Sequence, residues 1–183
     1  NGNAAANQLN GGDGCDVLTA GSGNDQLSGG SGNDTLSGGA DADTYFYNRG
    51  EGADTLIEGY YGVVDGHYDN ASADKVIFGA GITANDFSFS HVGNNLIADL
   101  GNGDSVTFKD WYLSVNNQVE SFQFANGTTL NALAFLNTRG TDQIGTDASE
   151  TLYGGVEIDR IQGGLGNDTI YSADGNDTLE GGA

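Results

Sequence analysis

The chain has no proline, no methionine, a single cysteine and only five basic residues among its 183 positions. A lone cysteine, Cys15, excludes an intramolecular disulfide. No stretch approaches the roughly 20 apolar residues of a membrane span, and the start, Asn1-Gly2-Asn3, lacks the basic and apolar regions of a signal peptide. The five basic residues face 26 acidic ones, for a formal charge of −21. Because so acidic a surface repels phosphates, the composition argues against a nucleic-acid partner.

Glycine is abundant, filling 32 of the 183 positions, which is more than twice the roughly 7% of average proteins. Turns must therefore be built from Gly, Asn and Asp instead of proline. Low hydrophobicity with high net charge is typical of disordered chains. It also suits a fold whose carboxylates are neutralised by bound cations. Composition leaves both interpretations open, and periodicity decides between them.

A nine-residue repeat runs through both ends of the sequence, with the pattern Gly-Gly-x-Gly-x-Asp-x-apolar-x. Copies occupy 11–19, 20–28, 29–37 and 38–46, with a degenerate copy at 2–10, and four more occupy 145–153, 154–162, 163–171 and 172–180. The sixth position holds Asp16, Asp25, Asp34 and Asp43 in the first series, Glu150, Asp159, Asp168 and Asp177 in the second, and Asn7 in the degenerate copy. Tandem copies in register indicate stacked structural units, not disorder.

Each copy predicts a turn followed by a very short strand. The glycines of the first six residues accept positive φ and leave room for a close neighbour. The last three residues, such as Thr35-Leu36-Ser37, suit a strand with one inward apolar side chain. Two copies then form one 18-residue coil, which stacks the sixth-position acids of alternate copies. The expected pairs are Asp16 with Asp34, Asp25 with Asp43, and Asp159 with Asp177.

The stacked carboxylates predict a requirement for calcium. Layers lie about 4.8 Å apart, and two negative charges near that distance repel by roughly 3 kcal/mol at an effective dielectric of 20. Repeated along a column, this repulsion rivals the roughly 5–15 kcal/mol stability of a domain, so we expect the calcium-free roll to be unstable. Ca²⁺ takes about 6–8 oxygen ligands, and the lack of a Cys or His cluster favours it over zinc or copper. The alternative is an acidic face that is merely solvated.

These repeats, for example GGDGCDVLT and GGSGNDTLS, resemble the RTX nonapeptide family of proteins exported by bacterial type I secretion. The resemblance implies a right-handed parallel β-roll, several bound calcium ions, and a chain that crosses the calcium-poor cytoplasm unfolded and folds outside the cell. It also implies that sixth-position acids are side-chain ligands and that turn glycines offer carbonyl ligands. The implied metal-site residues are Asp16, Asp25, Asp34, Asp43, Asp159, Asp168, Asp177, Asn7 and Glu150, with Gly12, Gly14, Gly21, Gly23, Gly30, Gly32, Gly164 and Gly166. Departures that mark weaker sites are Glu150 in an Asp position and Ala20, Asp41, Glu157 and Ser172 in glycine positions.

The period breaks after Phe46, and the middle of the chain predicts antiparallel strands. A half-motif at 49–58 keeps Asp54, another candidate ligand, after a two-residue insertion. Alternating apolar and polar residues then predict strands at 87–90, 96–100, 105–109 and 119–124, and a single helical turn at 132–136. This stretch resembles the segment that follows RTX repeats in many haemolysin-type calcium-binding proteins. The residues that carry the likeness are Ile77 to Ile82, Leu100 to Asp104, and Lys109-Asp110-Trp111-Tyr112.

Most aromatic residues of the chain lie in this middle segment, among them Phe87, Phe89, Phe108, Trp111, Phe122 and Phe124. They predict a hydrophobic core that caps the open end of the first roll, where bare strand edges would invite aggregation. The alternative is a ligand-binding aromatic cluster. The loop 58–70 offers a second candidate site, for a sugar or a further calcium ion, built from Tyr60, Tyr61, Asp65, His67, Tyr68 and Asp69. Aromatic loop residues that simply pack on the fold are the other interpretation.

The sequence therefore predicts an all-β protein with parallel β-roll blocks at 1–46 and 141–183 and a small antiparallel β segment at 47–140 between them. Gly181-Gly182-Ala183 has the form of a further copy. The sequence leaves open whether the blocks join into one roll with 47–140 looped out. Since neither a His-Glu-x-x-His helix nor a Gly-x-Ser-x-Gly elbow is present, we expect no catalytic activity.

The expected function is a calcium-triggered folding module of a larger bacterial protein that is secreted or held at the cell surface. The alternatives are a glycan- or surface-binding module of an adhesin and a non-catalytic appendage of a secreted enzyme. Expected partners are calcium, the rest of the parent protein and, for the adhesin, an extracellular glycan or cell surface. Neither nucleic acid nor a membrane span is expected.

Overall fold

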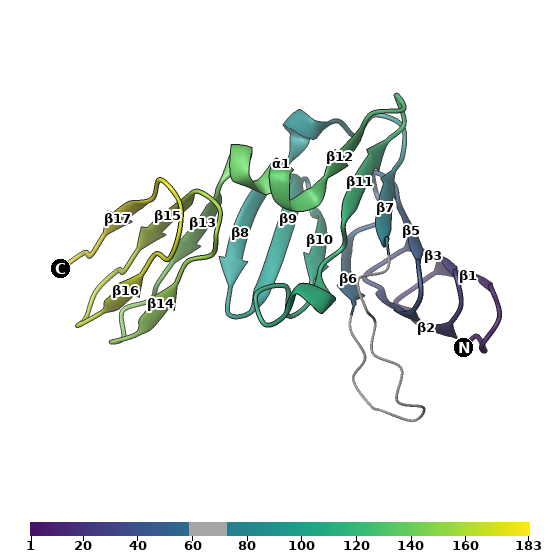
Figure 1. Cartoon of the computed structure of the whole chain (residues 1–183), viewed down its shortest axis with the longest axis horizontal. Helices are drawn as coiled ribbons and strands as arrows, with labels where there is room; N and C mark the ends of the chain where they lie inside the picture. The colour runs from purple at the N-terminus through teal and green to yellow at the C-terminus, as the bar shows by residue number, and fades with distance from the viewer. Residues whose placement is uncertain (59–72) are drawn as a thin grey trace.

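The computed structural model describes residues 1–58 and 73–183 as a row of short strands (Figure 1). Within these ranges the strands form three sheets, accompanied by one α-helix, α1 (Ala132–Arg139). The first sheet has the order β1 (Gln8–Asp13), β3 (Gln26–Ser31), β5 (Thr44–Tyr47), β7 (Lys75–Phe78), β11 (Ser121–Phe124) and β12 (Thr129–Asn131). The second has the order β17 (Thr178–Glu180), β15 (Asp159–Gln162), β13 (Thr141–Ile144), β8 (Ser88–Val92), β9 (Asn95–Gly101), β10 (Asp104–Phe108), β6 (Ala53–Ile57), β4 (Thr35–Ala40) and β2 (Val17–Ser22). The third pairs β14 (Thr151–Tyr153) with β16 (Thr169–Tyr171).

Successive repeats of the first block alternate between the two large sheets. Strands β1 and β3 pair in parallel with Leu9 opposite Leu27, and β2 and β4 pair in parallel with Leu18 opposite Leu36. Each partner is 18 residues away, so the predicted two-copy coil and the parallel β-roll are confirmed. The strands of this block are longer than predicted, because β1 to β4 continue into the glycines of the following copy.

Both sheets of the roll continue into the middle segment. Strands β7 and β11 extend the first sheet in parallel beyond β5, and β6 and β10 extend the second sheet in parallel beyond β4. Among the described strands, antiparallel pairing is confined to β8–β9–β10 and β11–β12. The helix α1 is longer than the predicted single turn, and the Asn131 side chain caps it by accepting a hydrogen bond from the Ala134 N–H at 2.9 Å.

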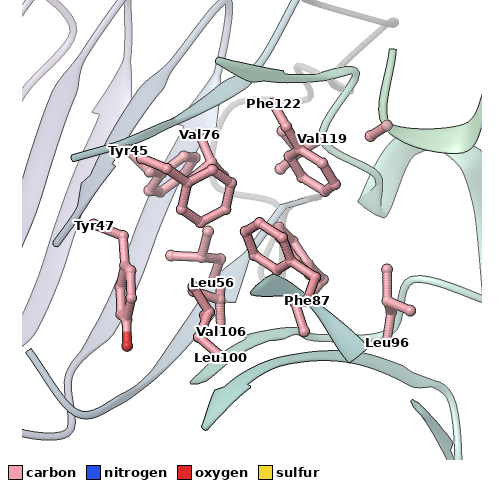
Figure 2. Packing of buried hydrophobic residues seen from close by; sticks show 14 of the residues in the cluster. Tyr45, Tyr47, Leu56, Val76, Phe87, Leu96, Leu100, Val106, Val119 and Phe122 are labelled. Carbon is pink, nitrogen blue, oxygen red and sulfur yellow. The ribbon is translucent and has the colours of Figure 1, made fainter. Parts of the chain in front are cut away.

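Aromatic side chains of the middle segment form the main core, as predicted (Figure 2). The ring of Phe78 contacts those of Tyr47, Phe87, Phe122 and Phe124, with centroids 4.9–6.3 Å apart. This cluster continues without a break into the interior of the first roll through buried Tyr45, Leu36 and Leu27. The roll and the segment that closes it therefore share one core.

The second block joins the same sheet at the far edge of the middle segment. Strand β13 pairs in parallel with β8 through Asp142 and Ser90, so one sheet runs from β2 to β17. The two blocks are thus linked through the middle segment, which is not looped out. The second block buries little: Leu152 and Ile161 are buried hydrophobic residues, whereas Ile144, Tyr153, Leu165, Tyr171 and Leu179 are each at least half exposed.

No helix within the described ranges has the length and apolar character that crossing a membrane requires. The candidate site in the loop 58–70 lies outside the described residues, apart from Glu58.

Candidate metal centre

The sixth-position acids of the first block stand in two columns, because each directly precedes a strand and parallel strands stack in register. In every layer the backbone N–H of one column residue donates to a carboxylate oxygen of the next. The column along the first sheet links Asn7 to Asp25 (2.7 Å), Asp25 to Asp43 (2.8 Å), Asp43 to Asp74 (2.6 Å) and Asp74 to Glu120 (2.7 Å). The column along the second sheet links Asp16 to Asp34 (2.7 Å) and Asp34 to Asp54 (2.9 Å).

The second block repeats this geometry in two shorter columns. The N–H of Glu150 donates to Asp168 Oδ1, and that of Asp159 donates to Asp177 Oδ1, each at 3.0 Å. The structure thus brings into a column every acid proposed from the repeats and from the half-motif, together with Asn7. Asp54 keeps its place because β6 pairs with β4 at an offset of 20 residues, which absorbs the two-residue insertion.

One oxygen of several column carboxylates is left buried without a hydrogen bond. Among the described residues these atoms are Oδ2 of Asp16, Asp25, Asp34, Asp54 and Asp168. A buried carboxylate oxygen is strongly destabilising unless a donor or a cation contacts it. The pattern therefore fits a divalent cation, because in Asp25, Asp34, Asp54 and Asp168 the backbone of the adjacent layer occupies Oδ1 while Oδ2 remains available.

The turn glycines bring the backbones of adjacent layers into close contact. Gly12, Gly30 and Gly39 have φ between +98° and +107°. A Cβ on Gly30 would overlap the carbonyl oxygen of Gly12, and one on Gly39 would overlap that of Gly21. The carbonyls of one layer thus point at the next, as ligands held between layers would. Glycine is required at the first position of the repeat for a different reason, because a Cβ on Gly29 would overlap Asp34 Oδ2 of the same copy.

The columns are unfavourable places for negative charge alone. Burial raises the pKa of Asp54 to about 7, and the charges of Asp34 and Glu51 add to the effect. Burial likewise raises the pKa of Asp25 and the pKa of Asp159. Each carboxyl therefore holds its proton more tightly than in water, which is expected for ligands that need a cation nearby to ionise.

Sequence reasoning predicted Asp43 but missed three acids that lie near it or continue its column, Glu58, Asp74 and Glu120. Asp43, Glu58 and Asp74 are all buried, and one carboxylate oxygen from each lies within 4.8 Å of the others. Asp74 and Glu120 do carry a signal, because Asp74-Lys75-Val76 and Glu120-Ser121-Phe122 keep the acid-x-apolar end of the repeat. Glu58 has no such signal, since it follows its strand.

Asp159, like Glu150, has both of its carboxylate oxygens engaged in hydrogen bonds. Oδ1 accepts a hydrogen bond from the Thr141 hydroxyl, and Oδ2 accepts one from the Gly155 N–H at 2.8 Å. Thr141 lies 18 residues earlier, in the position of the preceding acid. Glu157, one of the departures from the repeat, is buried and accepts a hydrogen bond from the Tyr112 hydroxyl at 2.6 Å. This end of the second block is therefore attached to the middle segment.

Two protein families match the chain. The RTX calcium-binding nonapeptide repeat (4 copies) matches residues 1–36, 19–56 and 144–183, which together cover just over half of the sequence. The haemolysin-type calcium binding protein related domain matches residues 96–132, within the middle segment. The chain matches none of the curated proteins with which it was compared.

Proposed function

The chain belongs to the family of RTX calcium-binding nonapeptide repeats, and we propose on this basis that it is a calcium-triggered folding module of a larger secreted bacterial protein. Repeats of this family bind calcium and form parallel β-rolls. The observation that carries the proposal is the set of buried Oδ2 atoms without hydrogen bonds in Asp16, Asp25, Asp34, Asp54 and Asp168. Because the negative charge on these oxygens must be neutralised before the chain can fold, the binding of calcium should cause it to fold.

The two oxygens of each column carboxylate have separate roles in this proposal. Oδ1 accepts the N–H of the neighbouring layer and so fixes the spacing of the coils, as in the 2.7 Å bond from Asp16 to Asp34. Oδ2 is the oxygen that ligates. Bound calcium supplies positive charge that offsets the repulsion between stacked carboxylates.

The residues that would hold calcium in the first block are the column acids with the turn carbonyls beside them. Asp16, Asp34 and Asp54 are flanked by Gly12, Gly14, Gly30 and Gly32, and Asp25 and Asp43 by Gly21 and Gly23. In the second block Glu150 and Asp168 stand in the column of Gly164 and Gly166, whereas Asp177 stands in the other column with Gly175 beside it. Asn7 contributes no charge, and Asp159 is held by Thr141 and Gly155, so both are weaker ligands.

A folding module contributes structure to its parent protein and catalyses no reaction, and we propose that this chain is non-catalytic. Calcium affinity in the extracellular range, about 10⁻⁴–10⁻³ M, would leave the chain unfolded in the cytoplasm and folded outside the cell. Its partners are then calcium and the rest of the parent protein, which the folded rolls stabilise or present.

Substitution of one column acid tests the proposal without breaking the column. Asp34→Asn removes the charge, while the amide oxygen still accepts the hydrogen bond that Asp16 N–H donates at 2.7 Å. The matched control is Asp13→Asn, the same change at the exposed last residue of β1. Circular dichroism during a calcium titration should show folding at a midpoint at least about threefold higher for Asp34→Asn, while Asp13→Asn stays near the wild type.

Two results would refute the proposal. One is a calcium-free chain that already has its full β spectrum and does not respond to added calcium. The other is an equal midpoint for Asp34→Asn and Asp13→Asn, because the buried oxygen would then have no part in binding. Asp168→Asn makes the same measurement in the second block, where Asp168 Oδ2 is also buried without a hydrogen bond.

A further inference from the structure

A cleft of 520 Å³ separates the middle segment from the second roll block. On one side lies the turn between β8 and β9, with Gly93 and Asn94. On the other lies β14, all three residues of which line the cleft together with Gly154, which follows it. Side chains of successive strand residues point to opposite faces, so consecutive residues line a cleft when the edge of the strand borders it. Strand β16 occupies the other edge of β14. The cleft therefore lies where a further strand would pair.

The side chains of this cleft are aromatic, aliphatic or polar but uncharged. The rings come from His91, Tyr112 and Tyr153, the polar groups from Asn94, Gln143 and Thr151, and the one aliphatic side chain is Leu152. Among the described residues that line it none is Asp, Glu, Lys or Arg, although 17% of the chain is charged. Such a lining selects against an ionic ligand, since a buried charge needs a partner of opposite sign.

Two polar atoms of the lining residues are buried and have no hydrogen-bond partner among the described residues. They are Gln143 Oε1 and His91 Nδ1, on side chains that are 9% and 4% exposed as residues. An amide oxygen can only accept a hydrogen bond, and a neutral imidazole nitrogen accepts or donates. A ligand with hydroxyl groups would satisfy both atoms.

The ring of Tyr153 provides an apolar surface beside these polar groups. It stacks on Tyr171 with centroids 5.2 Å apart and an interplanar angle of 12°, which holds the ring in place. Because Tyr171 belongs to β16, on the side of β14 away from the cleft, the other face of Tyr153 is turned toward the cleft. Aromatic faces carry partial negative charge, so they attract weakly positive C–H groups.

We propose that the cleft binds a neutral saccharide, with a sugar ring stacked on Tyr153 and its hydroxyls hydrogen-bonded to Gln143 and Asn94. A sugar combines C–H groups with hydroxyls that both donate and accept. An ammonium ligand would meet no carboxylate in the lining, and an apolar ligand would leave the polar atoms unpaired. The volume is within the range of small-ligand sites, about 300–1,000 Å³. The site is separate from the carboxylate columns and needs only that the second block be folded.

The test uses the full chain at saturating calcium on an array of neutral mono- and oligosaccharides. The saccharide that binds best is then titrated by calorimetry against Tyr153→Ala, Tyr153→Phe, Gln143→Leu and the control Val17→Ala, whose side chain is 72% exposed on β2 in the first block. We expect Tyr153→Ala and Gln143→Leu to bind at least about tenfold more weakly. Tyr153→Phe keeps the ring and should stay within about twofold of the wild type, as should Val17→Ala. Circular dichroism checks that each variant is folded.

The proposal is overturned if a folded chain binds no saccharide on the array, or if Tyr153→Ala and Gln143→Leu bind as well as the wild type. Selective binding of an alkylammonium ion or of an extended peptide at β14, in place of a saccharide, also overturns it. A chain that proves folded without calcium refutes the proposed function but leaves this measurement possible, so the two failures are distinguishable.

Discussion

At the residue scale, glycine at the second position of the repeat is required for two reasons, its backbone conformation and the close approach of adjacent coils. The structure separates these two reasons. Gly12 and Gly30 occupy the same position of their copies, with φ of +98° and +99°. A Cβ on Gly12 would meet nothing within 4 Å, whereas one on Gly30 would overlap the carbonyl oxygen of Gly12 in the adjacent layer. Both glycines are needed for backbone conformation, and only Gly30 is also needed for the close approach of two coils.

The pair Gly12→Ala and Gly30→Ala should therefore lose different amounts of stability. The positive φ alone costs an L-residue about 1–2 kcal/mol, which is the loss expected for Gly12→Ala. Gly30→Ala should lose in addition the roughly 1–3 kcal/mol typical of overpacking. Urea unfolding at saturating calcium measures the difference. Equal losses would mean that the coils move apart freely and that layer contact contributes nothing.

At the scale of elements, the attachment of the second block depends on a few polar contacts. Strand β13 meets β8 at one paired position, Asp142 and Ser90. Beside it the Tyr112 hydroxyl donates to buried Glu157 at 2.6 Å, and burial together with the Glu157 charge raises the pKa of Tyr112. Glu157 replaces the glycine at the fourth position of its copy. The sequence suggests that Glu157 weakens a calcium site. In the structure this residue instead forms a contact that joins the second block to the middle segment.

Tyr112→Phe should destabilise the chain by about 1–3 kcal/mol, because it removes a donor from a buried carboxylate. Glu157→Gln removes the charge, so the double variant Tyr112→Phe/Glu157→Gln should lose less than the sum of the single losses. Denaturant unfolding followed by fluorescence reports on this region directly, since Trp111, the only tryptophan, is buried next to Tyr112. The control is Tyr171→Phe, the same change at an exposed tyrosine of the second block, which also contains Glu157. Strict additivity would show that the two side chains are not coupled.

At the scale of the whole molecule, the sequence predicts the rolls well and the middle segment less well. The period of nine predicts that Asp25 stacks on Asp43 because partners 18 residues apart follow from the repeat itself. The next partners in that column, Asp74 and Glu120, are 31 and 46 residues further along, and loops of unequal length carry no period. Alternating residues likewise predict strands at 105–109 and 119–124, but not that β10 joins β6 and β11 joins β7 in parallel. The pairing partner and the direction of each strand in the middle segment are set by packing in the shared core, and the alternation of apolar and polar residues does not encode that packing.

The two roll blocks are unequal in what holds them together. The first shares its interior with the aromatic cluster of the middle segment, including Phe78 and Phe122. The second has Leu152 and Ile161 as its buried hydrophobic residues and meets the middle segment at one edge. Because hydrophobic burial is the main favourable term in folding, the second block should depend on calcium more than the first.

Removal of calcium should therefore open the molecule from its C-terminal end. When a chelator lowers free calcium stepwise, hydrogen exchange followed by mass spectrometry should show residues 145–183 losing protection first, at a calcium level where β7 and β11 are still protected. Local opening of this kind is expected where few apolar contacts oppose it. The strands of the aromatic core serve as the internal reference, because they lie in the same chain under the same conditions. Loss of protection at a single calcium level throughout would instead mean that the edge between β8 and β13 transmits stability fully, and that the chain folds as one cooperative unit.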